Sequence, residues 1–156
     1  MAADPAWDAP RAEGIIDSLL AREGPLLPIL HALQAAFGYV PEPAIPMLAA
    51  RLNLTRAEVH GVVSFYHDFR PAPSGRHVLK VCRAEACQAM GAERNLSGLL
   101  EGLGLRAGET TVDGRLTIEP VYCLGLCATA PSAMLDGEPH GRLDAQRLAA
   151  LAETAA

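Results

Sequence analysis

The four cysteines of this chain are the sequence feature that most constrains its fold and chemistry. They form two close pairs, Cys82 with Cys87 in a Cys-x4-Cys spacing and Cys123 with Cys127 in a Cys-x3-Cys spacing. The two pairs are separated by residues 88–122. In a reducing compartment, cysteines bind metal or perform chemistry more often than they form structural disulfides. One inorganic centre held by four thiolates is the simplest interpretation.

Composition and charge exclude several classes of partner. The 156 residues carry 18 acidic and 13 basic side chains, which gives a formal net charge of −5. Nucleic acids and anionic membranes attract basic surfaces, so we expect no nucleic-acid partner and no direct membrane contact. Charges or prolines interrupt every apolar run before it reaches membrane-spanning length. The N-terminal residues lack a basic region followed by an apolar one, and we therefore expect a cytoplasmic protein.

The N-terminal half has the apolar spacing of short helices. Residues 11–67 predict a bundle of about four helices, and the stripe within Leu26–Phe37 at i, i+4, i+7 and i+11 is one of them. Thr55 and Glu58 form the Thr-x-x-Glu pattern of a capping box at another helix start. Prolines and a glycine in residues 71–75 then break the pattern, so we place the first domain at residues 1–75.

The C-terminal half alternates between strand and helix patterns. The predicted elements are a strand at residues 77–82, a helix at 87–103, strands at 116–119 and 132–135, and a final helix capped by Asp144. Turns are expected at Asp113-Gly114 and Asp136-Gly137. The order strand, helix, strand, strand, helix predicts a small α/β or α+β domain at residues 76–156.

Three kinds of chemistry compete for the four thiolates. Dithiol chemistry usually uses Cys-x2-Cys at a helix start, and neither pair has that spacing. A structural zinc site accepts gaps of about two to four residues, so spacing alone leaves a zinc-stabilised adaptor open. An iron–sulfur cluster fits the surroundings better. The spacing differs from the usual four-iron run and from the plant-type loop, which favours a binuclear cluster of another kind.

The backbone expected around the cysteines also favours a cluster. A helix start at Cys87 would place this residue beside unpaired amides and the positive end of the helix dipole. Gly125, between the second pair, leaves the backbone uncovered there. Hydrogen bonds from such amides to the sulfurs of a negatively charged cluster set its potential.

Four ordered segments carry a family resemblance. They are Gln34-x-x-Phe-Gly-Tyr-x-Pro41, Gly61-Val-x-x-Phe-Tyr-x-x-Phe69, residues 108–114, and residues 123–131 around the second cysteine pair. The spacing of the two cysteine pairs adds to them. Together they resemble the thioredoxin-like 2Fe–2S ferredoxins, in particular the small, 24-kDa-type NADH-dehydrogenase subunit of respiratory complex I. The resemblance spans about residues 15–152. It implies an α+β fold, with an N-terminal helical bundle followed by a thioredoxin-like α/β domain. It also implies one 2Fe–2S cluster bound by Cys82, Cys87, Cys123 and Cys127, and no catalytic residue on this chain.

Residues 83–92 look most like the gamma subunit of soluble NAD-dependent formate dehydrogenases, because Gln88 stands where complex I chains often have histidine. We therefore expect an electron-transfer subunit of such an enzyme. Its partners would be a flavin- and NAD-binding beta subunit and a larger molybdenum and iron–sulfur alpha subunit. FMN, NAD and the molybdenum cofactor would lie on these partners, since this chain has no glycine-rich phosphate loop. The equivalent subunits of complex I and of NAD-reducing hydrogenases stay open as alternatives.

Overall fold

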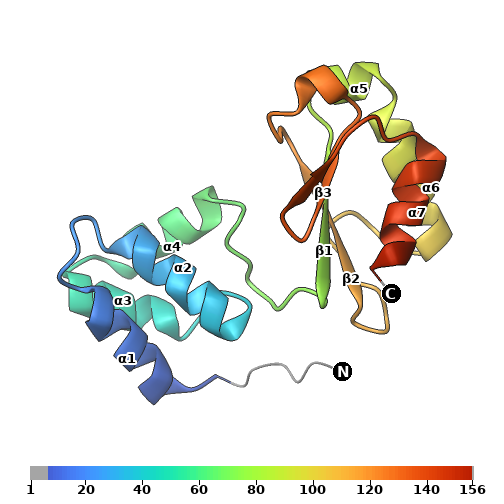
Figure 1. Cartoon of the computed structure of the whole chain (residues 1–156). Coiled ribbons are helices and arrows are strands. Elements are labelled where there is room, and N and C mark those ends of the chain that lie inside the picture. Colours follow the sequence, from blue (N-terminus) through green and yellow to red (C-terminus); the bar gives the residue numbers. More distant parts are fainter. Residues whose placement is uncertain (1–6, 156) are drawn as a thin grey trace. The chain divides into compact units, whose positions relative to one another are not determined.

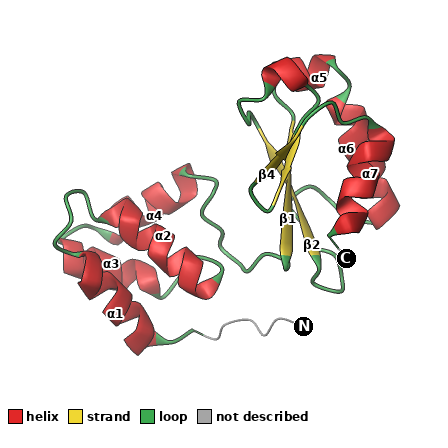
Figure 2. Ribbon diagram, in the orientation of Figure 1, coloured by secondary structure: helices red, strands yellow, loops and turns green. Residues whose placement is uncertain are grey.

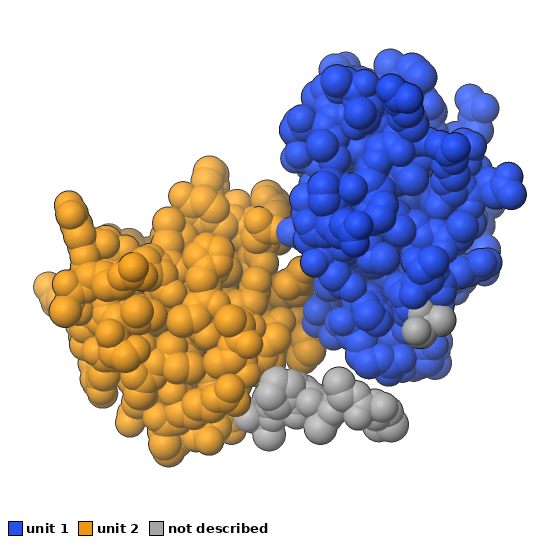
Figure 3. Space-filling view, viewed as in Figure 1, with its two compact units in different colours: residues 1–2, 74–156 blue, residues 3–73 orange. Residues whose placement is uncertain are grey.

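The computed structural model describes residues 7–155, which form two compact units that divide between residues 73 and 74 of the chain (Figure 3). Each unit has a hydrophobic core of its own. Among the described residues, no helix is both long enough and apolar enough to cross a bilayer.

The N-terminal unit is all-helical (Figure 2). Its helices are α1 (Ala9–Leu19), α2 (Leu26–Phe37), α3 (Ala44–Leu52) and α4 (Arg56–Phe65). The predicted apolar stripes face inward, and Leu30, Phe37 and Leu48 are fully buried in the core. The predicted capping box is present at the start of α4. The Thr55 hydroxyl accepts from the Glu58 amide at 3.2 Å, and Glu58 Oε2 accepts from the Thr55 amide at 2.7 Å.

The C-terminal unit is a mixed sheet with two long helices on one face (Figure 1). In chain order its elements are β1 (His77–Cys82), α5 (Glu85–Ala89), α6 (Ala92–Leu103), β2 (Leu116–Val121), a 3₁₀ turn (Cys127–Thr129), β3 (Ala133–Leu135), β4 (Glu138–His140) and α7 (Ala145–Thr154). The strand order is β2-β1-β3-β4, with β1 parallel to β2 and antiparallel to β3. Leu96 of α6 and Leu148 of α7 pack with Leu79 and Ile118 of the sheet. This is the predicted α+β architecture.

Two details differ from the sequence prediction. The expected helix at residues 87–103 is divided into α5 and α6, because Gly91 adopts a φ of 89°, which side chains other than glycine rarely tolerate. Because α5 begins at Glu85, Cys87 lies inside this short helix and not at the first residue of a long one. The strand β4 was not predicted, since Glu138-Pro-His has no apolar alternation and owes its conformation to pairing with β3.

Candidate metal centre

The sheet topology brings the two cysteine pairs to the same edge. Cys82 is the last residue of β1 and lies in register with Val121, the last residue of the parallel strand β2. The Arg83 amide continues this pairing, donating to the Val121 carbonyl at 2.8 Å. Cys123 lies two residues after Val121 in the sequence. On the other side of β1, the Cys82 amide donates to the Ser132 carbonyl at 3.0 Å. Three chain segments therefore converge where β1 ends.

The first pair is buried and well supplied with hydrogen bonds. Cys82 and Cys87 are each 2% exposed, and Cys87 Sγ lies 3.4 Å from the Ser132 hydroxyl. Burial raises the pKa of Cys82, but hydrogen bonds outweigh it. These come from the Ala84 amide, the Cys87 side chain, the Leu124 amide and the Ser132 hydroxyl, and the pKa of Cys82 is lowered as a result. The Leu124 amide lies between the second pair of cysteines, so it links the two pairs directly.

The second pair is exposed at the surface. Gly125 adopts a φ of 75°, a left-handed conformation that turns its amide toward Cys123 Sγ at 3.3 Å. The hydrogen bond with the Cys123 side chain raises the pKa of Cys127. Repulsion from the Cys123 thiolate, burial, and more distant repulsion from Cys87 and Cys82 raise it further. Cys127 Sγ is therefore within electrostatic reach of the other three sulfur atoms.

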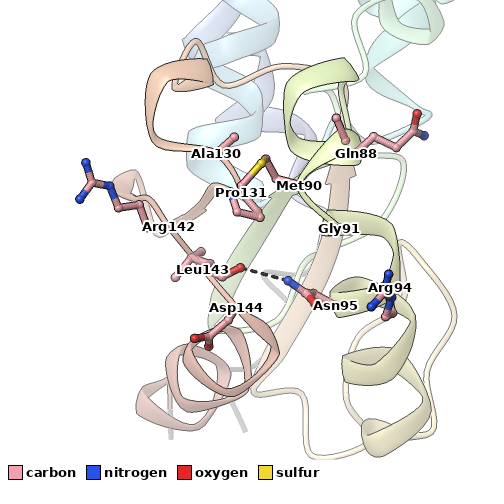
Figure 4. Close-up of a pocket in the computed structure, with 11 residues that line it drawn as sticks. Gln88, Met90, Gly91, Arg94, Asn95, Ala130, Pro131, Arg142, Leu143 and Asp144 are labelled. Carbon is pink, nitrogen blue, oxygen red and sulfur yellow. Dashed lines mark hydrogen bonds between the residues drawn. The ribbon is translucent and has the colours of Figure 1, made fainter.

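A groove of about 750 Å³ lies beside the site (Figure 4). Its lining is residues 88–91, Arg94, Asn95, Ala130, Pro131 and residues 142–144. Within it, Asn95 Nδ2 donates to the Leu143 carbonyl at 3.0 Å, and the Leu143 amide donates to the Pro131 carbonyl at 2.9 Å. The Ala130–Pro131 peptide bond is cis. These contacts hold the segment that leads to Ser132 against α6.

The donor set fits a binuclear iron–sulfur cluster. The cysteines form two pairs, one that begins at the end of β1 and one just after β2, and a cluster with one pair on each iron fits that arrangement. Amide and hydroxyl groups at the sulfurs supply the hydrogen bonds that such clusters use.

Comparison with known proteins supports the same interpretation. The model of the thioredoxin-like [2Fe-2S] ferredoxin family matches residues 12–156. The chain belongs to this family. Its fold and its cofactor, one 2Fe–2S cluster, are thereby confirmed, whereas the assignment of the four cysteines as ligands stays a prediction.

Two individual relatives show which members of the family the chain resembles. The chain is 37% identical over 128 residues to the NADP-reducing hydrogenase subunit HndA of Solidesulfovibrio fructosivorans, covering 82% of this chain and 75% of the relative. It is 38% identical over 124 residues to an NADH-quinone oxidoreductase subunit of Pseudomonas aeruginosa, covering 80% of this chain and 75% of the relative. The predicted relationship to the complex I subunit is confirmed, and the closeness to formate dehydrogenase stays a prediction.

A crystal structure of an NAD⁺-reducing [NiFe]-hydrogenase in the H₂-reduced state is also similar. It matches with a TM-score of 0.65 at 30% identity, over 81% of this chain. The matched part is 22% of the hydrogenase chain, so this family member corresponds to one segment of that protein.

Sequence reasoning found the cysteines but missed several groups around them. The Leu124 amide and the Ser132 hydroxyl reach the sulfurs because β1 pairs with segments distant in the sequence. Ser132 had one visible signal. It is a hydroxyl residue between Pro131 and an apolar strand, five residues after Cys127.

Proposed function

We propose that this chain is the electron-transfer subunit of a multi-subunit NAD-linked oxidoreductase, with Cys82, Cys87, Cys123 and Cys127 as the ligands of its 2Fe–2S cluster. The observation that carries the proposal is the meeting of both pairs at one end of the sheet, where Cys82 ends β1 in register with Val121 of β2, two residues before Cys123. The cluster accepts and releases one electron at a time.

The chain's own residues have two separate tasks in this proposal. Cys82 and Cys87 hold one side of the cluster in the protein interior, where water is excluded. Cys123 and Cys127 hold the other side at the surface, next to Tyr122, whose side chain is 74% exposed. This exposed side is where a redox partner can approach. The substrate-binding sites would lie on partner chains, with FMN and NAD on the neighbouring subunit.

The relatives favour one group of parent enzymes. By name, they belong to an NADH-quinone oxidoreductase and an NADP-reducing hydrogenase, so we infer a parent of the complex I or hydrogenase kind. A soluble NAD-dependent formate dehydrogenase, with beta and alpha partners, is the second candidate, favoured by Gln88 and its neighbours. We also propose that the chain is located in the cytoplasm, where thiols stay reduced.

Anaerobic purification followed by metal analysis tests the cluster. About two irons per chain, with matching acid-labile sulfide and visible absorbance, are expected for the wild type. Single Cys→Ser changes at the four positions should reduce the iron content. Exposed Ser97→Ala, on α6, is the control. Stoichiometric zinc without iron would instead show a structural adaptor. A metal-free protein that reduces disulfides would show a dithiol oxidoreductase.

Co-purification from the native host tests the parent enzyme. A flavoprotein recovered with hydrogenase or quinone-linked subunits supports the preferred group. Recovery with a large molybdenum-containing chain would transfer the assignment to formate dehydrogenase.

A further inference from the structure

Ser132 is a buried hydroxyl group that faces the sulfurs of the candidate site. Among the described residues, the buried polar side chains are those of Thr117 and Ser132. Thr117 has backbone and side-chain partners outside the site, the Gly75 amide at 2.7 Å and the Thr110 hydroxyl at 2.7 Å. Ser132, at 2% exposure, has Cys87 Sγ as its hydrogen-bond partner instead, at 3.4 Å.

The direction of the hydrogen bond follows from the chemistry of a cluster ligand. A cysteine bound to iron is a thiolate and has no proton to donate. In the cluster-bound chain, the Ser132 hydroxyl must therefore be the donor to Cys87 Sγ, which lies 3.4 Å away. Hydrogen bonds to charged acceptors are stronger than neutral ones, and a buried, weakly polar environment strengthens them further.

The backbone holds this hydroxyl in place. The Ser132 carbonyl accepts from the Cys82 amide, and the next residue, Ala133, pairs with Val81 across β1 and β3. On the preceding side, the Pro131 carbonyl is bound by the Leu143 amide. Removing the hydroxyl therefore leaves the backbone contacts of the segment intact.

We propose that Ser132 is a positioning residue that raises the reduction potential of the cluster by donating a hydrogen bond to the buried Cys87 Sγ. The reduced cluster has one more negative charge than the oxidised cluster, so the donor stabilises the reduced form more. This inference rests on the proposed ligand set, because it requires Cys87 to bind iron.

An EPR-monitored redox titration of the full chain with its cluster tests the proposal. Ser132→Ala is expected to keep its iron and to be harder to reduce. At the wild-type midpoint, its ratio of reduced to oxidised cluster should fall about threefold to tenfold, and tenfold corresponds to about 59 mV for one electron. Ser97→Ala, an exposed change on α6, should leave the midpoint unchanged.

A second pair of variants keeps the test decisive if Ser132→Ala binds its cluster poorly. Ser132→Thr keeps a hydroxyl, and Ser132→Val has nearly the same shape as that threonine without one. A lower midpoint in the valine variant than in the threonine variant supports the proposal. Equal midpoints in these two variants, or a wild-type midpoint in iron-loaded Ser132→Ala, overturn it. A wild-type chain that binds no iron would refute the ligand set instead.

Discussion

Gly141 packs directly against Thr129. A Cβ atom on Gly141 would meet Thr129 Oγ1 at 2.6 Å, its Cβ at 2.7 Å and its carbonyl oxygen at 2.9 Å. The next amide, that of Arg142, donates to the same carbonyl at 2.6 Å. Thr129 ends the 3₁₀ turn that Cys127 begins, so the loop at Gly141 supports the turn carrying one of the proposed ligands.

We predict that Gly141→Ala displaces this turn and weakens cluster binding. The variant should keep its far-UV circular dichroism but lose iron several times faster than the wild type during incubation with a chelator. Gly98→Ala is the matched control, because a Cβ there meets nothing within 4 Å. Its position inside α6 favours alanine over glycine by about 1 kcal/mol. Equal iron loss from Gly141→Ala and the wild type would contradict the supporting role of Gly141.

Asp136 joins the β3–β4 turn to the start of β1. Its Oδ1 accepts from the Val78 amide at 2.8 Å, and its Oδ2 lies 2.6 Å from His77 Nδ1. Burial raises the pKa of Asp136, but the hydrogen bonds with His77 and Val78 and the charge of His77 outweigh it, so this pKa is lowered. A carboxyl group with a lowered pKa stabilises the fold above its unfolded pKa, and this stabilisation is lost as the pH falls through the folded pKa.

Asp136→Asn should therefore reduce stability at neutral pH and less so in acid. Asparagine tolerates the φ of 50° at this position, which leaves the turn intact. Because the carboxyl is 45% exposed, we expect a loss of only about 0.5–1 kcal/mol at pH 7. Urea unfolding at several pH values should show this difference shrinking below about pH 4. Glu138→Gln, also in the β3–β4 hairpin, controls for the lost negative charge, and a pH-independent difference would count against the charged role.

Local signals account for the parts of the fold that the sequence predicted well. The capping box of Thr55 and the side chain of Asp144, which accepts from the Arg147 amide at 2.8 Å, need only neighbouring residues. The strand His77–Cys82 was predicted from a short apolar run with two valines, a residue type that favours strands. The break at Gly91 was missed because the apolar spacing of Ala92 and Leu96 continues smoothly from the preceding residues.

In the candidate site too, some features could be predicted from the sequence and others depend on the fold. The cysteines were visible because their residue type and spacing limit their chemistry. Their hydrogen-bond donors were less visible, since Ser132 reaches Cys87 through the pairing of β1 with β3, across 45 residues of sequence. The spacing of the cysteines did not reveal the antiparallel pairing of β1 with β3. This pairing decides which hydroxyl group faces a sulfur.

Thr55→Ala should destabilise the helical unit by about 1 kcal/mol, because the Glu58 amide loses its acceptor at the start of α4. Trp7 is the only tryptophan of the chain, and its ring lies 5.6 Å from that of Phe37 in this unit, so its fluorescence reports unfolding there. In a denaturant titration followed by Trp7 fluorescence, Thr55→Ala should have a lower unfolding midpoint than the wild type. Ser64→Ala, in the same helix, is the control, and an unchanged midpoint in Thr55→Ala would show that the box contributes little.

Finally, we predict that the two units are separately folding domains. Before the connection between the units, the Arg70 amide donates to Gln34 Oε1 at 2.7 Å. After the connection, the Gly75 amide donates to Thr117 Oγ1 at 2.7 Å. The short connection at residues 71–74 contains two prolines and lies between these two anchors. The sequence predicts a domain boundary after residue 75, and this stays a prediction; the compact units divide between residues 73 and 74.

A specific protease site inserted between Pro73 and Ser74 tests this prediction in the full chain. After cleavage, each fragment should keep its far-UV circular dichroism and unfold cooperatively, because each has its own buried core. The same insertion between Gly98 and Leu99, inside α6, is the control and should disrupt the C-terminal unit, since Leu99 packs in its core. Loss of structure in either fragment after cleavage at residue 73 would mean that the units depend on each other to fold.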